Sequence, residues 1–271
     1  MRYPILFIIV LSPLFAQSQY GRRSSNDNSN WLGISQGTSS PTRTSTLNFS
    51  NGYMPENPVG VIYQQGVRLT AEGDHGDDNQ GNDNNGFGGE LGIGDGQYGL
   101  AVGYYNRDCD NCEGDFVGAL GVSFSDVGLG FRFAEELYSV GLIFNTHGKH
   151  RFGLMAQLDD PDGDDNNIST FGAGYSYNGD RVTFSVDAAK RDFENDNNFD
   201  DTILVTPGLA VHFDSLSFSL SYDHYVDEDP NNPPQDDDLW FGVSFGDKQD
   251  WYVAIYHDYV NEWSASASFF F

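Results

Sequence analysis

The chain has 271 residues, of which 13 are Lys or Arg and 40 are Asp or Glu, so its formal net charge is −27. This charge argues against nucleic acid and anionic surfaces as natural partners, because like charges repel. Strong acidity can also indicate a disordered chain. Here, however, 15% of the residues are aromatic and the 32 glycines fall among segments with a period of two, which predicts a β-sheet protein.

Residues 1–18 are expected to be a secretory signal peptide. The basic residue Arg2 precedes the apolar run PILFIIVLSPLFA, and small residues follow at Ala16 and Ser18. A basic start, a short apolar core and a small-residue cleavage site are typical of export signals. Cleavage after Ala16 is an alternative to cleavage after Ser18.

Residues 19–58 lack alternation and are rich in Ser, Asn, Thr and Gly. Two interpretations of this segment remain open. One is a disordered periplasmic tail. The other is a plug that folds into the lumen of the domain that follows.

From residue 59 to the C-terminus, one pattern repeats. In the segment SLSFSLSYDHY, for example, Phe218 and Leu220 alternate with Ser217 and Ser219. Such alternation is typical of a β-strand with one apolar and one polar face. We count about fourteen such strands, which begin near residues 59, 87, 97, 116, 127, 137, 150, 168, 181, 202, 215, 239, 250 and 262.

The connections between these strands are of two kinds. Short turns alternate with long acidic connections, which hold more than half of the acidic residues and lie at 72–86, 107–115, 159–167, 191–201 and 227–238. Short turns at one end and longer loops at the other, with an even number of strands, are typical of outer-membrane barrels. A closed sheet is also the only sheet whose backbone hydrogen bonds are all satisfied in lipid.

We therefore predict an all-β fold, a transmembrane antiparallel up-and-down barrel of about fourteen strands formed by residues 59–271. The polar face of each strand would point into the lumen, and the apolar face would contact lipid, including lipopolysaccharide. The predicted location is the cell outer membrane, with the acidic loops on the extracellular side. A soluble β-sandwich is the alternative fold.

The last segment, EWSASASFFF, places Trp263, Phe269 and Phe271 on one face, opposite a row of serines. A terminal aromatic residue on a final alternating strand resembles the signal by which the barrel assembly machinery recognises outer-membrane barrels. We expect this machinery to be a partner, with these aromatic side chains carrying the signal.

The stretch YMPENPVGVIYQQGVRLTAE, residues 53–72, resembles the N-terminal signature of the FadL-type long-chain fatty acid transporter family. The matching residues are Asn57, Pro58 and Gly60, with Val59 in place of the usual Ala. The resemblance implies a fourteen-stranded barrel with an N-terminal hatch, here residues 19–58. It also implies an outer-membrane diffusion channel for small hydrophobic or amphipathic solutes, which needs no cofactor.

The chain departs from this family in ways that keep other functions open. It is shorter than typical members, and its predicted inward face consists mostly of Gly, Ser and Thr. A general porin with an acidic, cation-favouring mouth is therefore one alternative. A structural or adhesive surface barrel, acting through its acidic loops, is another.

Charged residues on the predicted inward face are the candidate lining of a conduction path, because rings of charge set selectivity in pores. The alternative is that they pair with one another or with the plug, and simply fill the lumen. They are Arg68, Glu90, Arg107, Arg132, Arg151, Arg181, Asp187, Asp223 and Asp258.

Cys109 and Cys112 lie in the polar segment RDCDNCEGD, which has no strand or helix pattern. In an exported chain this spacing predicts a small local disulfide, Cys109-Cys112. A redox-active pair would need a helix start and a βαβ context. Two thiolates alone also make a poor zinc site.

Catalysis is not expected. The neighbours Asp223-His224 and His257-Asp258 suggest acid–base chemistry, but adjacent residues of a strand point to opposite faces, so neither pair can act by itself. Only a pairing across strands stays open.

No specific metal site is predicted either. Asp160, Asp162 and Asp164 alternate as in hard-cation loops, but the segment lacks the Gly and the Glu of an EF-hand. We expect weak binding of divalent cations there at most.

Overall fold

The computed structural model describes residues 57–63, 66–77, 83–108, 115–134, 137–159, 168–193, 202–227, 238–247, 251–258 and 263–271. The strands are β1 (Gly66–Asp77), β2 (Asp83–Gly94), β3 (Tyr98–Asp108), β4 (Asp115–Phe124), β5 (Val127–Phe133), β6 (Leu137–Phe144), β7 (His150–Asp159), β8 (Ile168–Asn178), β9 (Val182–Phe193), β10 (Thr202–Phe213), β11 (Leu216–Asp227), β12 (Asp238–Asp247), β13 (Trp251–Asp258) and β14 (Trp263–Phe270).

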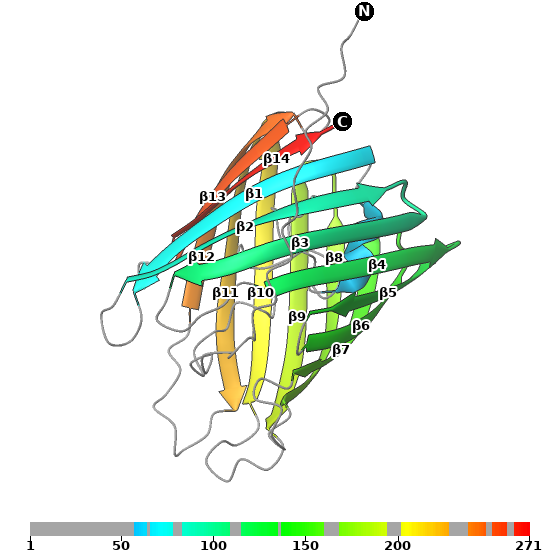
Figure 1. Cartoon of the computed structure of the whole chain (residues 1–271). Coiled ribbons are helices and arrows are strands. Elements are labelled where there is room, and N and C mark those ends of the chain that lie inside the picture. Colours follow the sequence, from blue (N-terminus) through cyan, green and yellow to red (C-terminus); the bar gives the residue numbers. More distant parts are fainter. Residues whose placement is uncertain are drawn as a thin grey trace, which may run out of the picture.

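These fourteen strands form one closed antiparallel barrel (Figure 1). Each strand pairs with its neighbours in sequence, and β1 closes the barrel against β14, with Arg68 opposite Phe270. The predicted fold, an up-and-down barrel of fourteen strands, is therefore confirmed. Within the part of the chain that the structure describes, no helix has the length and apolar character needed to span a bilayer.

The first strand begins later than its sequence pattern indicates. Pro58–Tyr63 form a short 3₁₀ helix, η1, and β1 starts at Gly66, so the prediction of a strand from residue 59 is wrong. Pro58 favours a first helical turn, because its ring fixes φ and it has no N–H to leave unpaired. The other strands begin at or near the predicted residues, with the largest difference at β2.

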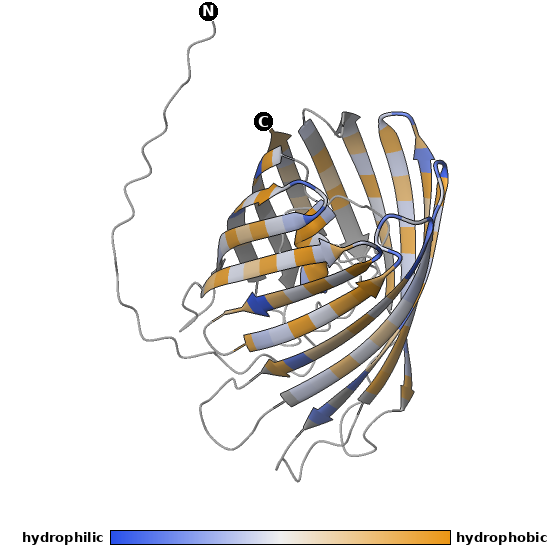
Figure 2. Ribbon diagram, turned by 90° about the vertical axis from the view of Figure 1, so that its right-hand side faces the viewer, coloured by the Kyte–Doolittle hydropathy of each residue, from blue (hydrophilic) through white to orange (hydrophobic). Residues whose placement is uncertain are grey.

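Side chains alternate between the two faces of the wall, as β5 illustrates most clearly. The ribbons carry alternating apolar and polar bands (Figure 2). On β5 the exposed residues are Val127, Leu129, Phe131 and Phe133, and the buried residues are Gly128, Gly130 and Arg132.

Large apolar side chains are exposed on the outer face of every strand, from Leu69 on β1 to Phe269 on β14. Soluble monomers rarely expose an apolar surface of this extent. The outer face of the barrel is therefore the surface that contacts the hydrocarbon of the membrane, and the inner face is the one built from small and polar residues.

Tight turns join the strands at the end of the barrel where β1 begins. Ser125, between β4 and β5, and Asp214, between β10 and β11, both have positive φ angles, of 58° and 40°. Positive φ is the backbone geometry that two-residue hairpin turns require. Short periplasmic turns and longer extracellular loops are typical of outer-membrane barrels, so this end is the periplasmic one.

Candidate functional site

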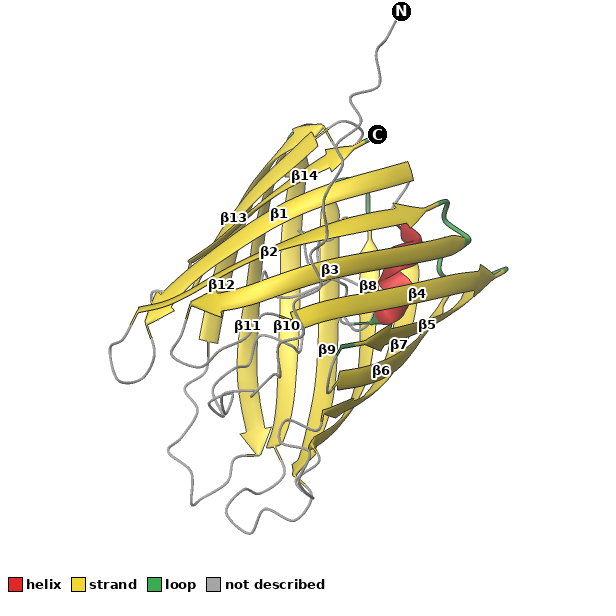
Figure 3. Ribbon diagram, viewed as in Figure 1, coloured by secondary structure: helices red, strands yellow, loops and turns green. Residues whose placement is uncertain are grey.

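The helix η1 lies inside the barrel against the inner face of β3 to β6 (Figure 3). A Cβ at Gly99 would overlap the main chain at Val61, and a Cβ at Gly130 would overlap the main chain at Val59. Glycine is therefore required because the helix backbone lies directly on the sheet. We call the inward glycines beneath the helix the glycine cradle: Gly99, Gly121, Gly128, Gly130 and Gly141.

Asn57 ties the start of η1 to the wall. Its side-chain Nδ2 donates hydrogen bonds to the main-chain carbonyl oxygens of Leu142 on β6 and Leu154 on β7, at 3.2 Å each. Its Oδ1 accepts a hydrogen bond from the N–H of Val59 at 3.2 Å, and its carbonyl oxygen accepts one from Gly60 at 2.9 Å. The Asn57-Pro58-Val59-Gly60 motif therefore forms a turn that is anchored to two strands.

Apolar side chains hold η1 against the wall after this anchor. Val59 and Ile62 pack on Ile143 of β6, and Val61 packs against Ala101 and Ala119. All three helix side chains are fully buried. Burial of one such side chain contributes about 1.5–3 kcal/mol, so these contacts stabilise the seated helix.

The end of η1 contacts the periplasmic turn between β2 and β3. The N–H of Gly96, which has a φ of 87°, donates to the carbonyl oxygen of Ile62 at 3.0 Å. The Asp95 carboxylate orders this turn by accepting hydrogen bonds from the N–H groups of Tyr98 (2.7 Å) and Gln97 (2.8 Å). These two hydrogen bonds hold the pKa of the exposed Asp95 carboxyl below its ordinary value.

Several of the predicted inward charges are buried and paired in the lumen wall. Arg68 on β1 forms an ion pair with Glu90 on β2, and both side chains are almost inaccessible to solvent. Arg132 on β5 donates through Nη2 to Oε1 of Gln157 on β7 at 2.7 Å. Arg68 and Glu90 therefore compensate each other's charge, whereas Arg132 is hydrogen-bonded to a neutral amide.

Arg151 on β7 connects the wall to the helix, because its guanidinium lies 4.4 Å from the ring centre of Tyr63, the last residue of η1. Such cation–π contacts contribute about 0.5–2 kcal/mol.

Asp187 on β9 is buried on the inner face. Arg181 lies in the turn before β9 and is exposed.

The remaining predicted sites are only partly described. Arg107, Asp223 and Asp258 lie on β3, β11 and β13, but their side chains fall outside the described residues. The same holds for the side chain of Trp263 at the start of β14, whereas Phe269 and Phe271 are exposed. Residues outside the description altogether are Cys109, Cys112, Asp160, Asp162, Asp164 and residues 19–56 of the predicted hatch.

His212 on β10 is a lumen residue that sequence reasoning missed. Its Nε2 lies 3.0 Å from the hydroxyl of Thr183, and its Nδ1 lies 3.0 Å from the hydroxyl of Ser217. In a hydrolytic triad, a carboxylate binds one of the two histidine nitrogens. In this structure each nitrogen of His212 lies beside a hydroxyl group. His212 lies an even number of positions along the chain from the inward residues Thr206 and Ala210, and this spacing could have identified it as a lumen residue.

The lumen also contains an apolar cluster that the Gly, Ser and Thr composition of the inward face did not predict. Met155 on β7, Ala189 on β9, Leu204 on β10 and Tyr225 on β11 are buried together. A second apolar region surrounds η1, as described above. The inner face is thus a polar hydroxyl-bearing wall with two apolar areas.

A closed barrel with an apolar outer face and a helix seated in its lumen defines a transmembrane β-barrel of the outer-membrane type. No protein-family model matches the chain, and no curated protein matches its sequence.

Solved structures share the fold, and these include FadL-type hydrocarbon channels. The CymD monoaromatic hydrocarbon channel aligns with a TM-score of 0.61 at 11% identity, over 89% of this chain and 98% of that chain. The toluene transporter TbuX of Ralstonia pickettii aligns with a TM-score of 0.57 at 8% identity, over 79% and 91%. A bacterial polysaccharide outer membrane secretin aligns with a TM-score of 0.53 at 9% identity, over 76% and 98%. At these identities the likeness establishes the fold, and the resemblance to the FadL-type barrel holds at that level.

Proposed function

We propose that this protein is an outer-membrane diffusion channel for small hydrophobic or amphipathic solutes. The observation that carries the proposal is the seated helix. Val59, Val61 and Ile62 are buried against the wall and hold η1 in the lumen, so the helix occupies space that a general porin would leave as a water-filled pore. The anchor at Asn57 fixes the helix in this position.

The apolar cluster on the far strands supports the same proposal. Met155, Leu204 and Tyr225 form a second apolar area on the inner face, and a solute that passes η1 would contact their nearly buried side chains once neighbouring groups move aside. Polar groups on the same path come from His212 and its hydroxyl partners, which lie at the periplasmic end of β10 and away from this cluster. CymD and TbuX, whose names describe a hydrocarbon channel and a toluene transporter, share the fold.

Two rival functions make different predictions. A general porin with a cation-favouring mouth is favoured by the acidic composition and by the many inward Ser and Thr residues. It would pass hydrophilic solutes and favour cations, and this preference would weaken at high salt. An adhesive barrel would pass neither kind of solute at an appreciable rate.

The distinguishing experiment is uptake by Gram-negative cells that lack their own major porins and retain an intact lipopolysaccharide layer. Expression of the chain should give saturable uptake of an apolar tracer such as toluene, with little gain for a hydrophilic sugar. The Leu204→Asp substitution, which places a charge in the apolar cluster, should slow toluene uptake. The matched control is Ser219→Asp, on the inner face of β11 and outside that cluster.

The opposite pattern would support the porin. Rapid sugar uptake, with toluene uptake unchanged by Leu204→Asp, would contradict the hydrophobic channel. Heat-modifiable migration on mild-detergent gels checks that each variant has formed a barrel.

We also propose that the barrel assembly machinery recognises the end of β14. The support is that Phe269, on the strand that closes against β1, and Phe271, directly after that strand, are both exposed. Deleting Phe271 should slow insertion of the barrel into the outer membrane, measured by the appearance of the heat-modifiable form. Insertion at the wild-type rate would rule out this role for Phe271.

A further inference from the structure

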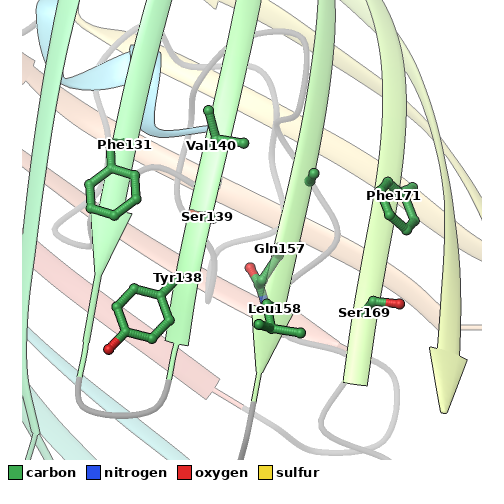
Figure 4. Close-up of a pocket in the computed structure, with 9 residues that line it drawn as sticks. Phe131, Tyr138, Ser139, Val140, Gln157, Leu158, Ser169 and Phe171 are labelled. Atoms are coloured by element: carbon green, nitrogen blue, oxygen red, sulfur yellow. The ribbon is translucent and has the colours of Figure 1, made fainter. Parts of the chain in front are cut away.

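The outer face of the barrel is interrupted by a hollow of about 310 Å³ on strands β5 to β8 (Figure 4). Its rim consists of side chains that belong to the lipid-facing set: Phe131, Tyr138, Val140, Leu158 and Phe171. The hollow lies near Leu137, where β6 begins, and near Asp159 and Ile168, the ends of β7 and β8 that a long connection joins. This is the extracellular end of the barrel.

The strand register explains the hollow. Ala156 on β7 lies directly between Val140 on β6 and Phe171 on β8, so one small side chain separates two large ones. One step toward the loops, Ser169 lies opposite Leu158. Ala156 and Ser169 are therefore the low points of a surface whose neighbours are bulky.

Hydrocarbon is the material that fits this hollow. Unfilled space would forfeit the dispersion contacts of the surrounding side chains, and an apolar recess does not retain water. Phe131 and Phe171 are 39% and 57% exposed, so the rim is open to the bilayer rather than to the lumen. The recess is continuous with the lipid-facing surface, and its occupant must therefore come from the membrane.

The polar groups of the recess lie at one end. The hydroxyl group of Tyr138 points toward the loop end of the strands, and Ser169 lies at that same end (Figure 4). Tyrosine at this depth is typical of the membrane interface, where its ring is apolar and its hydroxyl meets polar groups. Ester and amide carbonyls at the heads of acyl chains are acceptors for such hydroxyl groups, and a lipid with several acyl chains can offer one to each of the two residues, which lie on either side of Leu158.

We propose that this recess is a binding site for one acyl chain of an extracellular-leaflet lipid, with polar groups at the head of the lipid bound separately by Tyr138 and by Ser169. The chain would run over Ala156 between Phe131, Val140 and Phe171. This site does not depend on the proposed transport function, because it lies on the opposite face of the wall from η1.

Native mass spectrometry of the full-length barrel in detergent, after removal of endogenous lipid and titration with purified lipid A, tests this site. The substitution Ala156→Phe fills the recess and should weaken lipid A binding about tenfold or more, which corresponds to about 1.4 kcal/mol. The matched control is Ala71→Phe, an exposed outward alanine on β1, whose neighbouring strands β2 and β14 do not line the recess. It should bind lipid A as the wild type does.

A second variant keeps the test independent of packing strain at residue 156. Tyr138→Phe combined with Ser169→Ala leaves the recess open but removes both hydroxyl groups. This double variant should lose more affinity for lipid A than for a detergent that has an alkyl chain but no ester or amide carbonyl. Equal lipid A affinity in the wild type, Ala156→Phe and the double variant would overturn the proposal. A wild-type dimer that Ala156→Phe dissociates would also overturn it, because the occupant would then be a second copy of the chain.

Discussion

The side-chain amide of Asn57 donates a hydrogen bond to the main-chain carbonyl oxygen of Leu142, 3.2 Å away and 85 residues later in the chain. This contact joins the segment before the barrel to the middle of β6. It explains why an Asn-Pro pair precedes the first strand: the Asn binds the wall, and the Pro starts the helix that lies on the glycine cradle.

Asn57→Asp should loosen the helix. Aspartate keeps the acceptor for the N–H of Val59 but loses the two hydrogen bonds that Asn57 donates to Leu142 and Leu154. An unmade buried hydrogen bond costs about 1–3 kcal/mol, and urea unfolding in lipid vesicles should report a loss of that order. Wild-type stability in Asn57→Asp would show that the anchor does not hold η1.

The buried pair Arg68 and Glu90 should respond to substitution as a unit. Glu90→Leu leaves the Arg68 charge without its main partner in the wall, and breaking a buried pair in this way costs about 3–5 kcal/mol. The double variant Arg68→Met with Glu90→Leu removes both charges and should be more stable than Glu90→Leu alone. Additive losses in a double-mutant cycle would mean that the two residues do not interact.

The two faces of β11 should tolerate charge differently. Phe218 and Leu220 are exposed to lipid, so Arg at either position near the bilayer midplane should cost about 2–4 kcal/mol. Arg at Ser219, which faces the lumen, should be nearly neutral. If unfolding measurements gave the reverse order of costs, the assignment of β11 side chains to the two faces would be wrong by one residue.

The periplasmic turn at Asp95 should give a pH-dependent contribution to stability. Because its folded-state pKa is lowered, the contribution is fully present above the ordinary carboxyl pKa, and it is lost as the pH falls through the lowered folded-state value. The urea midpoints of the wild type and Asp95→Ala should therefore differ at neutral pH and converge in acid. A difference that persists unchanged at low pH would assign the effect to another group.

Much of the barrel could be predicted from the sequence because a period of two is a local signal. Around Phe218 on β11 and Leu129 on β5, every second residue is apolar, and this alternation alone identifies the face that points outward. Turn residues such as Asp214-Ser215 mark the ends of strands in the same local way. The strand starts were therefore close to those observed, except at the first strand.

The helix η1 could not be predicted because its residues favour strands in isolation. Val59, Val61 and Ile62 are β-branched, and only the space above the glycine cradle makes the helix the better arrangement. The cluster around Leu204 and the recess at Ala156 depend on which residues lie opposite across strands. That register follows from barrel closure and is not visible in one segment.

The measurement that tests the central claim most directly is single-channel conductance in planar bilayers, comparing the mature chain with a variant lacking residues 19–63. If η1 narrows the lumen of an apolar-solute channel, the intact chain should conduct ions weakly, and the deletion should raise conductance sharply. Strong, cation-favouring conductance in the intact chain that the deletion leaves unchanged would contradict the account and indicate a general porin.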